Sequence, residues 1–284
     1  MPMRGDRAVD ALSEETFLAF AQIAHDVAGL HLPGSKRAMV AARVSKRLSR
    51  LALTSFEEYL ALVARRDSAE RQRFIASLTT HVSKFFREPH HFAFLRETVL
   101  PSLMRRAQAG ERIRLWSAGC AHGQEAYSIA LTLLEAGVDP HALDIKVLGT
   151  DIDPAVIRTA QLGAYHETIM RQVPPALRAA HFSFDPSSGA FLASKGLRDM
   201  VIFRELNLHD PWPMPGRFDV IFCRNVMIYF DAARQNALWR RFEGKLCPGG
   251  WLFVGHSERV SAQAAPALLP HAHTIYALAS AGPA

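Results

Sequence analysis

The residues with the clearest chemical potential lie in one short segment, LWSAGCAHGQEAYS (Leu115–Ser128). Its start is apolar and strand-like, and Tyr127 opens the helical spacing of apolar residues that follows. Between them, Gly119 and Gly123 predict a turn where the backbone passes close to a ligand and the new helix offers unpaired N–H groups. The same turn also occurs in α/β packing without a ligand, and two glycines fall short of a full dinucleotide fingerprint. This segment alone is therefore compatible both with a ligand-binding turn and with a turn that only packs.

Two acidic residues follow the next predicted strand, Asp144–Gly149. Asp151 stands at the strand tip, where the carboxylate of a doubly wound sheet can accept hydrogen bonds from both hydroxyls of a ribose. Asp153 precedes Pro154 and is typical of a helix N-cap. Either residue could be a cap, but we favour the ribose interpretation for Asp151 and the cap for Asp153.

Polar residues also follow two later strand-like runs. Arg217–Phe222 has the character of a central strand and leads into Cys223-Arg224-Asn225, and Val201–Phe203 leads towards Asn207-Leu208. In folds of this kind the carboxyl ends of the strands lie over the ligand crevice. We therefore expect these residues to be able to reach a ligand.

The elements that must position these residues change character along the chain. The first 80 or so residues have helical periodicity without strand-like alternation, and the predicted helix starts are Ser13, about Ser35, the capping box at Ser55, and the residues after Asp67. A longer helix is predicted from Glu88-Pro89 to about Ala107. From Ile113 strands and helices alternate, which is typical of a parallel sheet. We predict a small helical domain followed by a doubly wound α/β domain.

Composition narrows the class of protein. The chain has 284 residues, 49% hydrophobic and 21% charged, as in ordinary globular proteins. Its first residues lack the apolar core of a secretory signal, and no apolar run reaches the ~18 residues that span a bilayer. The three cysteines are odd in number and not spaced as metal pairs, which favours a reducing cytoplasm and no metal site. The net charge of +6 suggests an acidic partner without identifying it.

The second predicted helix is basic along one face. Its cations include Arg43, Lys46, Arg47 and Arg50, with no acidic residue among them. A solvated face is the ordinary interpretation, yet exposed helices usually mix both signs. A face of one sign is therefore a candidate contact for nucleic acid, anionic lipid or an acidic protein surface.

Taken together, these segments resemble the CheR family of chemotaxis receptor methyltransferases, which use S-adenosylmethionine to esterify glutamates on chemoreceptor signalling helices. The matching segments occur in the family's order over most of the chain: LTTHVSKFFRE (Leu78–Glu88), LWSAGCAHGQEAYSIA, LGTDID, CRNVMIYF (Cys223–Phe230), LCPGGWLFVG and HSE (His256–Glu258). CRNVMIYF and the FFRE segment are specific to the family, whereas GTDID and PGG occur in many methyltransferases.

The resemblance implies S-adenosylmethionine as cofactor and S-adenosylhomocysteine as product. It also implies a helical N-terminal domain over residues 1–85, which would dock the receptor. Residues 86–284 would form a Rossmann-like methyltransferase domain with a small β-rich insertion at about residues 165–204. The cofactor contacts, Gly119 of the turn included, map onto His81, Ser83, Arg87, Gly119, Glu125, Asp151, Asn207, Leu208, Cys223, Arg224 and Asn225.

The chain departs from the family pattern at a few of these positions. The family commonly has Asn and Thr where this chain has His81 and Ser83, and often Glu where it has Gln124. Ser83 keeps a hydroxyl, His81 keeps hydrogen-bonding capacity, and Glu125 retains the charge of the turn. We interpret these differences as tolerated variation.

The implied reaction requires few catalytic groups. A glutamate with an unperturbed pKa of about 4.3 is already ionised at neutral pH, so the nucleophile needs no general base. Arg87 could hold the cofactor's carboxylate or position the substrate. Tyr229 could hydrogen-bond the acceptor or simply pack in the core, and the resemblance favours the first role. We assign these two residues to catalysis.

The basic helix gains a candidate partner from the resemblance. Receptor signalling helices present rows of Glu and Gln, so Arg43, Lys46, Arg47 and Arg50 could guide docking by charge complementarity. We expect a cytoplasmic monomer that acts on chemoreceptors, with neither nucleic acid nor membrane insertion.

Two other functions remain as alternatives. A nucleic-acid methyltransferase would agree with the net charge, but the Asn-Pro-Pro-Tyr-like loop typical of base-amino methylation is replaced by Arg224-Asn225-Val226-Met227. A non-catalytic module that binds S-adenosylmethionine would bind without turnover, and the retained Arg87, Glu125, Asp151 and Tyr229 argue against it.

Overall fold

The computed structural model describes residues 11–279, which form two compact units. The first holds the described residues up to Thr80 together with Tyr229–Asp231, and the second holds the rest from His81 onward. The second unit thus begins a few residues before the boundary predicted at residue 85. The reason is packing, since the ring of Phe85 lies 5.0 Å from that of Tyr165 in the second unit.

The first unit is built from helices. They are α1 (Glu14–Ala28), the 3-10 turn η1 (Gly34–Lys36), α2 (Arg37–Leu51), α3 (Phe56–Ala64) and α4 (Ala69–Leu78). The predicted caps are confirmed, because Ser13 Oγ accepts the N–H of Thr16 and Ser55 Oγ that of Glu58, each at 3.1 Å. Gly29 ends α1 in the left-handed region at φ 67°.

Apolar faces of these helices meet in one core. The ring of Phe20 lies 5.1 Å from that of Phe74 and 6.0 Å from that of Tyr59, and all three side chains are fully buried. Val40 and Leu48 of α2 are also fully buried. Burying side chains of this size stabilises a fold by roughly 1.5–3 kcal/mol each. The apolar face of α2 therefore anchors it in the unit.

A short segment from late in the chain completes the first unit. Leu30 and Phe230 form an antiparallel bridge, and the N–H of His31 donates to the carbonyl of Tyr229 at 2.8 Å. The imidazole Nε2 of His25 lies 3.0 Å from a carboxylate oxygen of Asp231. Tyr229–Asp231 is thus tied to α1 and the loop after it.

The second unit contains a seven-stranded sheet in the order β6-β2-β1-β7-β8-β10-β9. The strands are β1 (Ile113–Ala118), β2 (Ile145–Asp151), β6 (Val201–Glu205), β7 (Phe218–Cys223), β8 (Leu246–Val254), β9 (Leu268–Ala272) and β10 (Ile275–Leu278). Neighbours are parallel from β6 to β8, and β10 is antiparallel to both β8 and β9. On one side of β1 lie β2 and then β6, whereas β7 and β8 lie on its other side. The strand order therefore reverses between β1 and β7.

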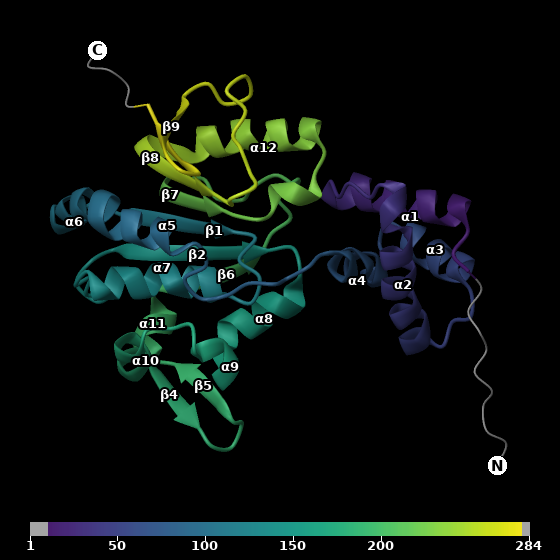
Figure 1. The fold of residues 1–284 in the computed structure, drawn as a ribbon, viewed down its shortest axis with the longest axis horizontal. Coiled ribbons are helices and arrows are strands. Elements are labelled where there is room, and N and C mark those ends of the chain that lie inside the picture. Colours follow the sequence, from purple (N-terminus) through teal and green to yellow (C-terminus); the bar gives the residue numbers. More distant parts are fainter. Residues whose placement is uncertain (1–10, 280–284) are drawn as a thin grey trace. The chain divides into compact units, whose positions relative to one another are not determined.

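Helices cover both faces of this sheet, as Figure 1 shows for α7 and α12. The helical segments of this part of the chain are α5 (Pro89–Phe94), η2 (Leu95–Val99), α6 (Leu100–Gln108), α7 (Gln124–Glu135), α8 (Pro154–Leu162), α9 (Glu167–Met170), α10 (Pro175–His181), α11 (Lys195–Asp199), η3 (Met227–Tyr229) and α12 (Ala232–Lys245). On β1, Leu115 points into the core that contains Ile129 of α7, whereas the ring of Trp116 lies 5.4 Å from Phe242 of α12. Successive side chains of a strand face opposite ways, so the sheet is doubly wound as predicted.

A second, three-stranded sheet has the order β3-β5-β4. Its strands are β3 (Ala164–His166), β4 (Phe182–Asp185) and β5 (Ala190–Ala193), all paired antiparallel. In Figure 1, β4 and β5 project beyond α9 and α10. This sheet is the small β insertion expected in the α/β domain.

Three features differ from the sequence prediction. The predicted helix from Pro89 contains a π turn, Leu95–Val99, just before Pro101, which has no N–H to close an α-helical bond. β8 begins at Leu246 and so includes Pro248, Gly249 and Gly250, residue types that do not predict the interior of a strand. The hairpin of β9 and β10 was not predicted, because its outer strand is mostly exposed and lacks a clear alternation. Among residues 11–279, no helix is long and apolar enough to cross a membrane.

Candidate active site

The reversal of strand order gathers candidate residues at the carboxyl ends of β1, β2 and β7. After β1, Gly119 turns the chain at φ +79°, and a Cβ there would lie 2.4 Å from Val226 Cγ2. The N–H of Gly119 donates to the carbonyl of Thr150 at 2.8 Å, which ties the turn to the end of β2. The lack of a side chain at Gly119 therefore allows the turn to pack closely against the loop that follows β7.

Asp151 is the last residue of β2 and is 6% exposed. Its carboxylate accepts the N–H of Ala121 at 2.9 Å and that of Asp153 at 3.1 Å. Asp153 in turn accepts the N–H of Ala155 at 2.7 Å, so its predicted role as the N-cap of α8 is confirmed. The two acidic residues thus have different roles, and only Asp151 stands at the crevice.

His81 joins the same cluster from the start of the second unit. Its Nε2 lies 3.3 Å from Asp151 and its Nδ1 lies 3.8 Å from Asp153. The ring of His122 stands edge-on to it at 6.1 Å, and burial, followed by the charge of His81, lowers the pKa of His122. The departure from the family's Asn therefore places an imidazole directly against Asp151.

Arg224, just after β7, is the buried centre of the site. It is 5% exposed, and its Nη1 lies 3.0 Å from Glu125 while its Nη2 lies 3.2 Å from Glu88. Nη2 also donates to the carbonyl of Arg87, and Ser117 Oγ donates to the other oxygen of Glu125 at 2.7 Å. Arg224 and Glu125 were both predicted to contact a cofactor, but their side chains bind each other and hold three segments together.

Burial and charge act in opposite directions on the two carboxylates of this network. Burial raises the pKa of Glu125, although Arg224 favours its charged form. For Glu88, burial also raises the pKa, but Arg224 and the backbone N–H of His256 outweigh it, so the pKa of Glu88 lies below its ordinary value. Glu88 is therefore held as the counter-ion of Arg224.

Glu258 is a functional residue that the sequence analysis did not single out. Its carboxylate accepts the backbone N–H groups of Asn225 (2.9 Å), Val226 (2.8 Å), Met227 (2.8 Å) and Gly255 (2.6 Å). One buried side chain thereby fixes the loop after β7. The only signal in the sequence was its place in the HSE segment.

Several residues at the site have strained backbones. Phe86, Glu88, Ala121 and Asn225 all have φ between 50° and 59° although none is glycine. Such conformations cost about 1–3 kcal/mol each and persist where surrounding contacts hold them. At Asn225 the bond to Glu258 supplies such a contact.

Two buried acceptors at this edge have no hydrogen-bond partner, Asn225 Oδ1 and Gln124 Oε1. Buried polar atoms are normally satisfied, so these oxygens fit a ligand that brings donors. Cys223, at the end of β7, is fully buried, and burial raises the pKa of its thiol well above the ordinary value. The carboxyl edge of the sheet thus combines an acidic strand tip, a glycine turn and unpaired acceptors.

Asn207 and Leu208 follow β6 next to the tip of β2. The N–H of Leu206 donates to the carbonyl of Asp151 at 2.9 Å, which joins the two strand ends. The side chain of Asn207 accepts the N–H of His209 at 3.1 Å, and Leu208 is buried. Both residues therefore follow a strand end that is joined to the tip of β2, and their contact with a cofactor stays a prediction.

The two residues assigned to catalysis lie in different units. Arg87 and Ser83 belong to the second unit, where Arg87 Nη1 donates to the carbonyl of Val82 at 3.3 Å. Tyr229 belongs to the first unit, and its hydroxyl donates to the carbonyl of Thr80 at 3.4 Å. Their roles at the reacting atoms remain predictions.

The basic face of α2 is only partly available. Arg47 forms two hydrogen bonds to the buried Glu70, at 2.7 and 2.8 Å, and Arg43 donates to the carbonyls of Ser77 and Thr79 at 2.9 Å. Lys46 and Arg50 are exposed. Arg47 and Arg43 were predicted to dock a partner, but both serve to join α2 to α4 and the segment after it.

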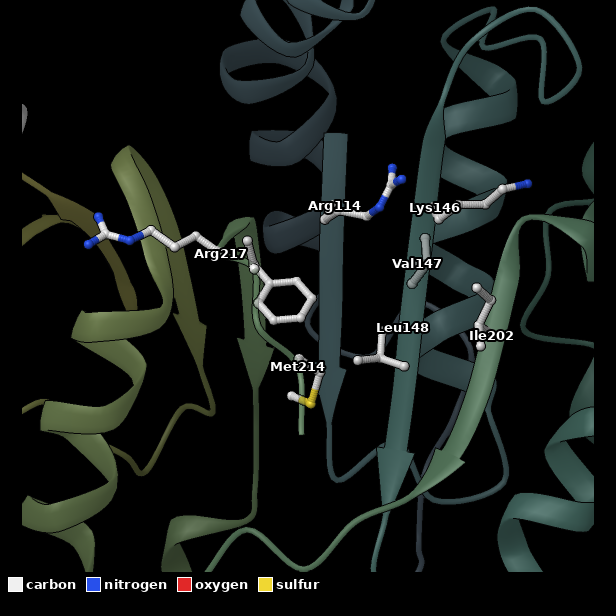
Figure 2. Close-up of a pocket in the computed structure, with 9 residues that line it drawn as sticks. Arg114, Lys146, Val147, Leu148, Ile202, Met214 and Arg217 are labelled. Carbon is white, nitrogen blue, oxygen red and sulfur yellow. The ribbon is translucent and has the colours of Figure 1, made fainter. Parts of the chain in front are cut away.

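A cavity of about 250 Å³ lies elsewhere in the second unit, at the amino ends of the strands. Figure 2 shows its apolar floor, including Leu148 and Ile202, with the basic groups of Arg114, Lys146 and Arg217 directed away from it. Ligand sites typically combine an apolar lining with converging polar groups. This cavity lacks such convergence among its lining residues, so the crevice at the carboxyl ends is the better cofactor site.

Comparison with known proteins agrees with this geometry. Residues 81–273 match the family model described as "CheR methyltransferase, SAM binding domain", and residues 15–79 match "CheR methyltransferase, all-alpha domain". A probable chemotaxis protein methyltransferase of Rhizobium etli is 46% identical over 240 residues, 84% of this chain and 90% of that protein. A chemotaxis protein methyltransferase of Salmonella typhimurium is 41% identical over 256 residues, 88% of this chain and 86% of that protein.

The fold and the matched family models define a methyltransferase that binds S-adenosylmethionine and contains a doubly wound sheet. The chain belongs to the CheR methyltransferase family.

Proposed function

We propose that this protein transfers a methyl group from S-adenosylmethionine to glutamate side chains of chemoreceptors, forming methyl esters in chemotactic adaptation. The relatives from Rhizobium etli and Salmonella typhimurium, which are named as chemotaxis protein methyltransferases, support this assignment. The residues at the crevice support the reaction type.

The observation that carries the proposal is that the carboxylates of the site are already engaged. Glu125 and Glu88 pair with Arg224, Glu258 accepts four backbone N–H groups, and Asp151 accepts two. Groups bound in this way are poorly placed to abstract a proton. A glutamate acceptor needs no such group, because its carboxylate is ionised at neutral pH.

The chain's own residues would bind the cofactor and orient the reacting groups. Asp151 would accept hydrogen bonds from ribose hydroxyls, and the unpartnered oxygens of Asn225 and Gln124 would accept from a ligand's amine or hydroxyl donors. The cofactor, when bound, supplies an electrophilic methyl group on a sulfonium. Arg224 holds the loop of Asn225 against Glu125, so the pocket is preorganised and can align the partners and exclude water.

Arg87 and Tyr229 are the proposed catalytic residues. Arg87 carries a planar guanidinium that suits a carboxylate, and we assign it to the cofactor's carboxylate or to positioning of the substrate. Tight pairing with the acceptor would blunt its nucleophilicity. Tyr229 would hydrogen-bond the acceptor through its hydroxyl.

The helical unit would recognise the receptor. Lys46 and Arg50 of α2 are exposed and positive, and receptor signalling helices that carry Glu and Gln would complement them. We infer that the protein works in the cytoplasm as a monomer on chemoreceptors, not on nucleic acid.

Radiolabelled S-adenosylmethionine offered to membranes that carry chemoreceptors tests the proposal. We expect label in the receptor band and its release as methanol at high pH, because esters hydrolyse in alkali whereas N-methyl groups do not. The Arg87→Ala variant should lose most receptor labelling. Lys84→Ala, a neighbouring exposed cation, is the matched control.

Other outcomes would assign the protein to another class. Alkali-stable label would exclude a carboxyl ester. Cofactor binding without any receptor labelling would favour a non-catalytic module or another acceptor, and RNA would then be the acceptor to offer.

A further inference from the structure

We propose that Glu88, His90 and His91 form a binding site for a transition-metal cation such as Zn²⁺. Their potential ligand atoms all lie within 4.8 Å of one another in the second unit. The cluster adjoins the cofactor crevice through Glu88, which pairs with Arg224. Zinc accepts imidazole nitrogen and carboxylate oxygen at about 2.0–2.2 Å, so this set has the right chemistry.

The tautomer of His91 supports a metal at its Nδ1. His91 is fully buried, and its Nε2 lies 2.8 Å from Thr274 Oγ1. That hydroxyl is also 2.6 Å from the carbonyl of His273, to which it can donate, and its oxygen can then accept the proton of Nε2. In this tautomer the lone pair is on Nδ1. Metal-bound histidines typically donate their other N–H in this way.

The carboxylate of Glu88 lies next to Nδ1. His91 Nδ1 is buried without a hydrogen-bond partner and lies 3.5 Å from Glu88 Oε2, an oxygen that is also 3.2 Å from Arg224 Nη2. A buried ring nitrogen of this kind is unfavourable unless a cation or another donor satisfies it.

His90 supplies the third ligand and the route from solvent. It is exposed, and its ring centroid lies 4.2 Å from that of His91. Three protein ligands leave one tetrahedral position for water, as in open zinc sites. Small side-chain rotations would bring the three atoms to bonding distance.

Metal binding at this site would oppose cofactor binding. Arg224 Nη2 lies 3.2 Å from the same oxygen of Glu88, and two cations near one oxygen repel each other. Saturating Zn²⁺ should therefore weaken the affinity for S-adenosylhomocysteine several-fold in the unmodified chain.

Calorimetric titration of the tag-free full-length chain with ZnCl₂ tests the site without cofactor or receptor. We expect one high-affinity site, at least tenfold weaker in His90→Ala and unchanged in His141→Ala, another exposed histidine. His90 is exposed, so its variant should fold. Equal Zn²⁺ affinity in His90→Ala and the unmodified chain would overturn the proposal, as would the lack of any site tighter than about 100 μM.

A crystal soaked with Zn²⁺ provides a second, independent measurement. Anomalous density between Glu88 and His91 would support the assignment. Zinc bound only at other histidines, such as His256 or His273, would contradict it. Neither result depends on which acceptor the enzyme methylates, so the proposed function can fail while the metal site stands.

Discussion

Arg224 shows how one buried cation can organise a site from distant segments. Its partners are Glu88, before α5, and Glu125, in the first turn of α7. Removing one member of a buried ion pair is strongly destabilising because it leaves the other charge uncompensated. These ion pairs thus fix the position of the segment after β7 relative to α5 and α7.

Gly119 gives a test at the residue scale. Gly119→Ala should lose about 3 kcal/mol of unfolding free energy and at least tenfold in affinity for S-adenosylhomocysteine, because the new Cβ meets Val226 as well as an unfavourable φ. The matched control is Gly137→Ala, which has φ +85° but open space around its Cβ. Chemical denaturation and calorimetry measure both effects. Equal losses in the two variants would show that the contact with Val226 is unimportant.

His91 predicts a pH dependence of stability. Its folded pKa of about 2 lies below the ordinary value of 6.5, so the unfolded chain binds a proton that the folded chain does not. The contribution of His91 to stability is complete above pH 6.5 and falls as the pH decreases, by about 2 kcal/mol at pH 5. In EDTA, His91→Gln should show a correspondingly smaller loss between pH 7 and pH 5 in urea unfolding. An identical loss in both chains would refute this role.

At the scale of elements, α2 combines two functions on its polar face. Arg47 reaches Glu70 of α4, which is 4% exposed and also accepts from the hydroxyl of Tyr59 at 2.9 Å. Burial, followed by the bond to Glu70, favours neutral Tyr59 and raises the pKa of this phenol well above its ordinary value. The network therefore joins three helices.

Arg47→Met should destabilise the protein by about 3 kcal/mol because Glu70 would stay buried without its main partner. The matched control is Arg73→Met, since Arg73 approaches the same carboxylate at 3.3 Å but its side chain is 61% exposed. An exposed pair contributes about 1 kcal/mol or less. Thermal and urea unfolding compare the two, and similar losses would contradict the assignment of Arg47 as the structural cation.

At the scale of the whole molecule, we propose that the two units carry separate tasks, receptor docking and cofactor binding. The contacts described for the crevice lie in the second unit, and the exposed cations of α2 lie in the first. Substitutions of exposed cations in the first unit should therefore affect receptor binding, and substitutions at the site in the second unit should affect cofactor binding.

Reversing Lys46 and Arg50 to Glu should raise the KM for receptor roughly tenfold at low salt through lost charge complementarity. The affinity for S-adenosylhomocysteine and the kcat should stay unchanged. Reversal of Arg65 and Arg66, exposed cations beyond the end of α3, changes net charge equally and serves as the control. Steady-state methylation at two salt concentrations measures the effect, and an unchanged KM would remove α2 from the docking surface.

Local signals explain why much of the fold could be predicted from sequence. Ser13, Ser55 and Asp153 cap helices as expected, because a cap depends on neighbours a few residues away. The doubly wound order follows from alternating strands and helices. The hairpin of β9 and β10 escaped prediction because its pairing depends on the edge of a sheet formed earlier in the chain.

The sequence by itself determined the family, the cofactor and the strand tips at which Gly119, Asp151 and Arg224 lie, since these depend on local motifs in a fixed order. Only the tertiary structure decided which charged side chains form ion pairs within the fold. In the sequence, Arg47 and Glu125 look available to bind a partner or a cofactor. In the structure they form ion pairs with Glu70 and Arg224, which are distant in the chain. Charge partners are set by three-dimensional proximity, because a buried charge must be compensated by whichever group packing brings to it.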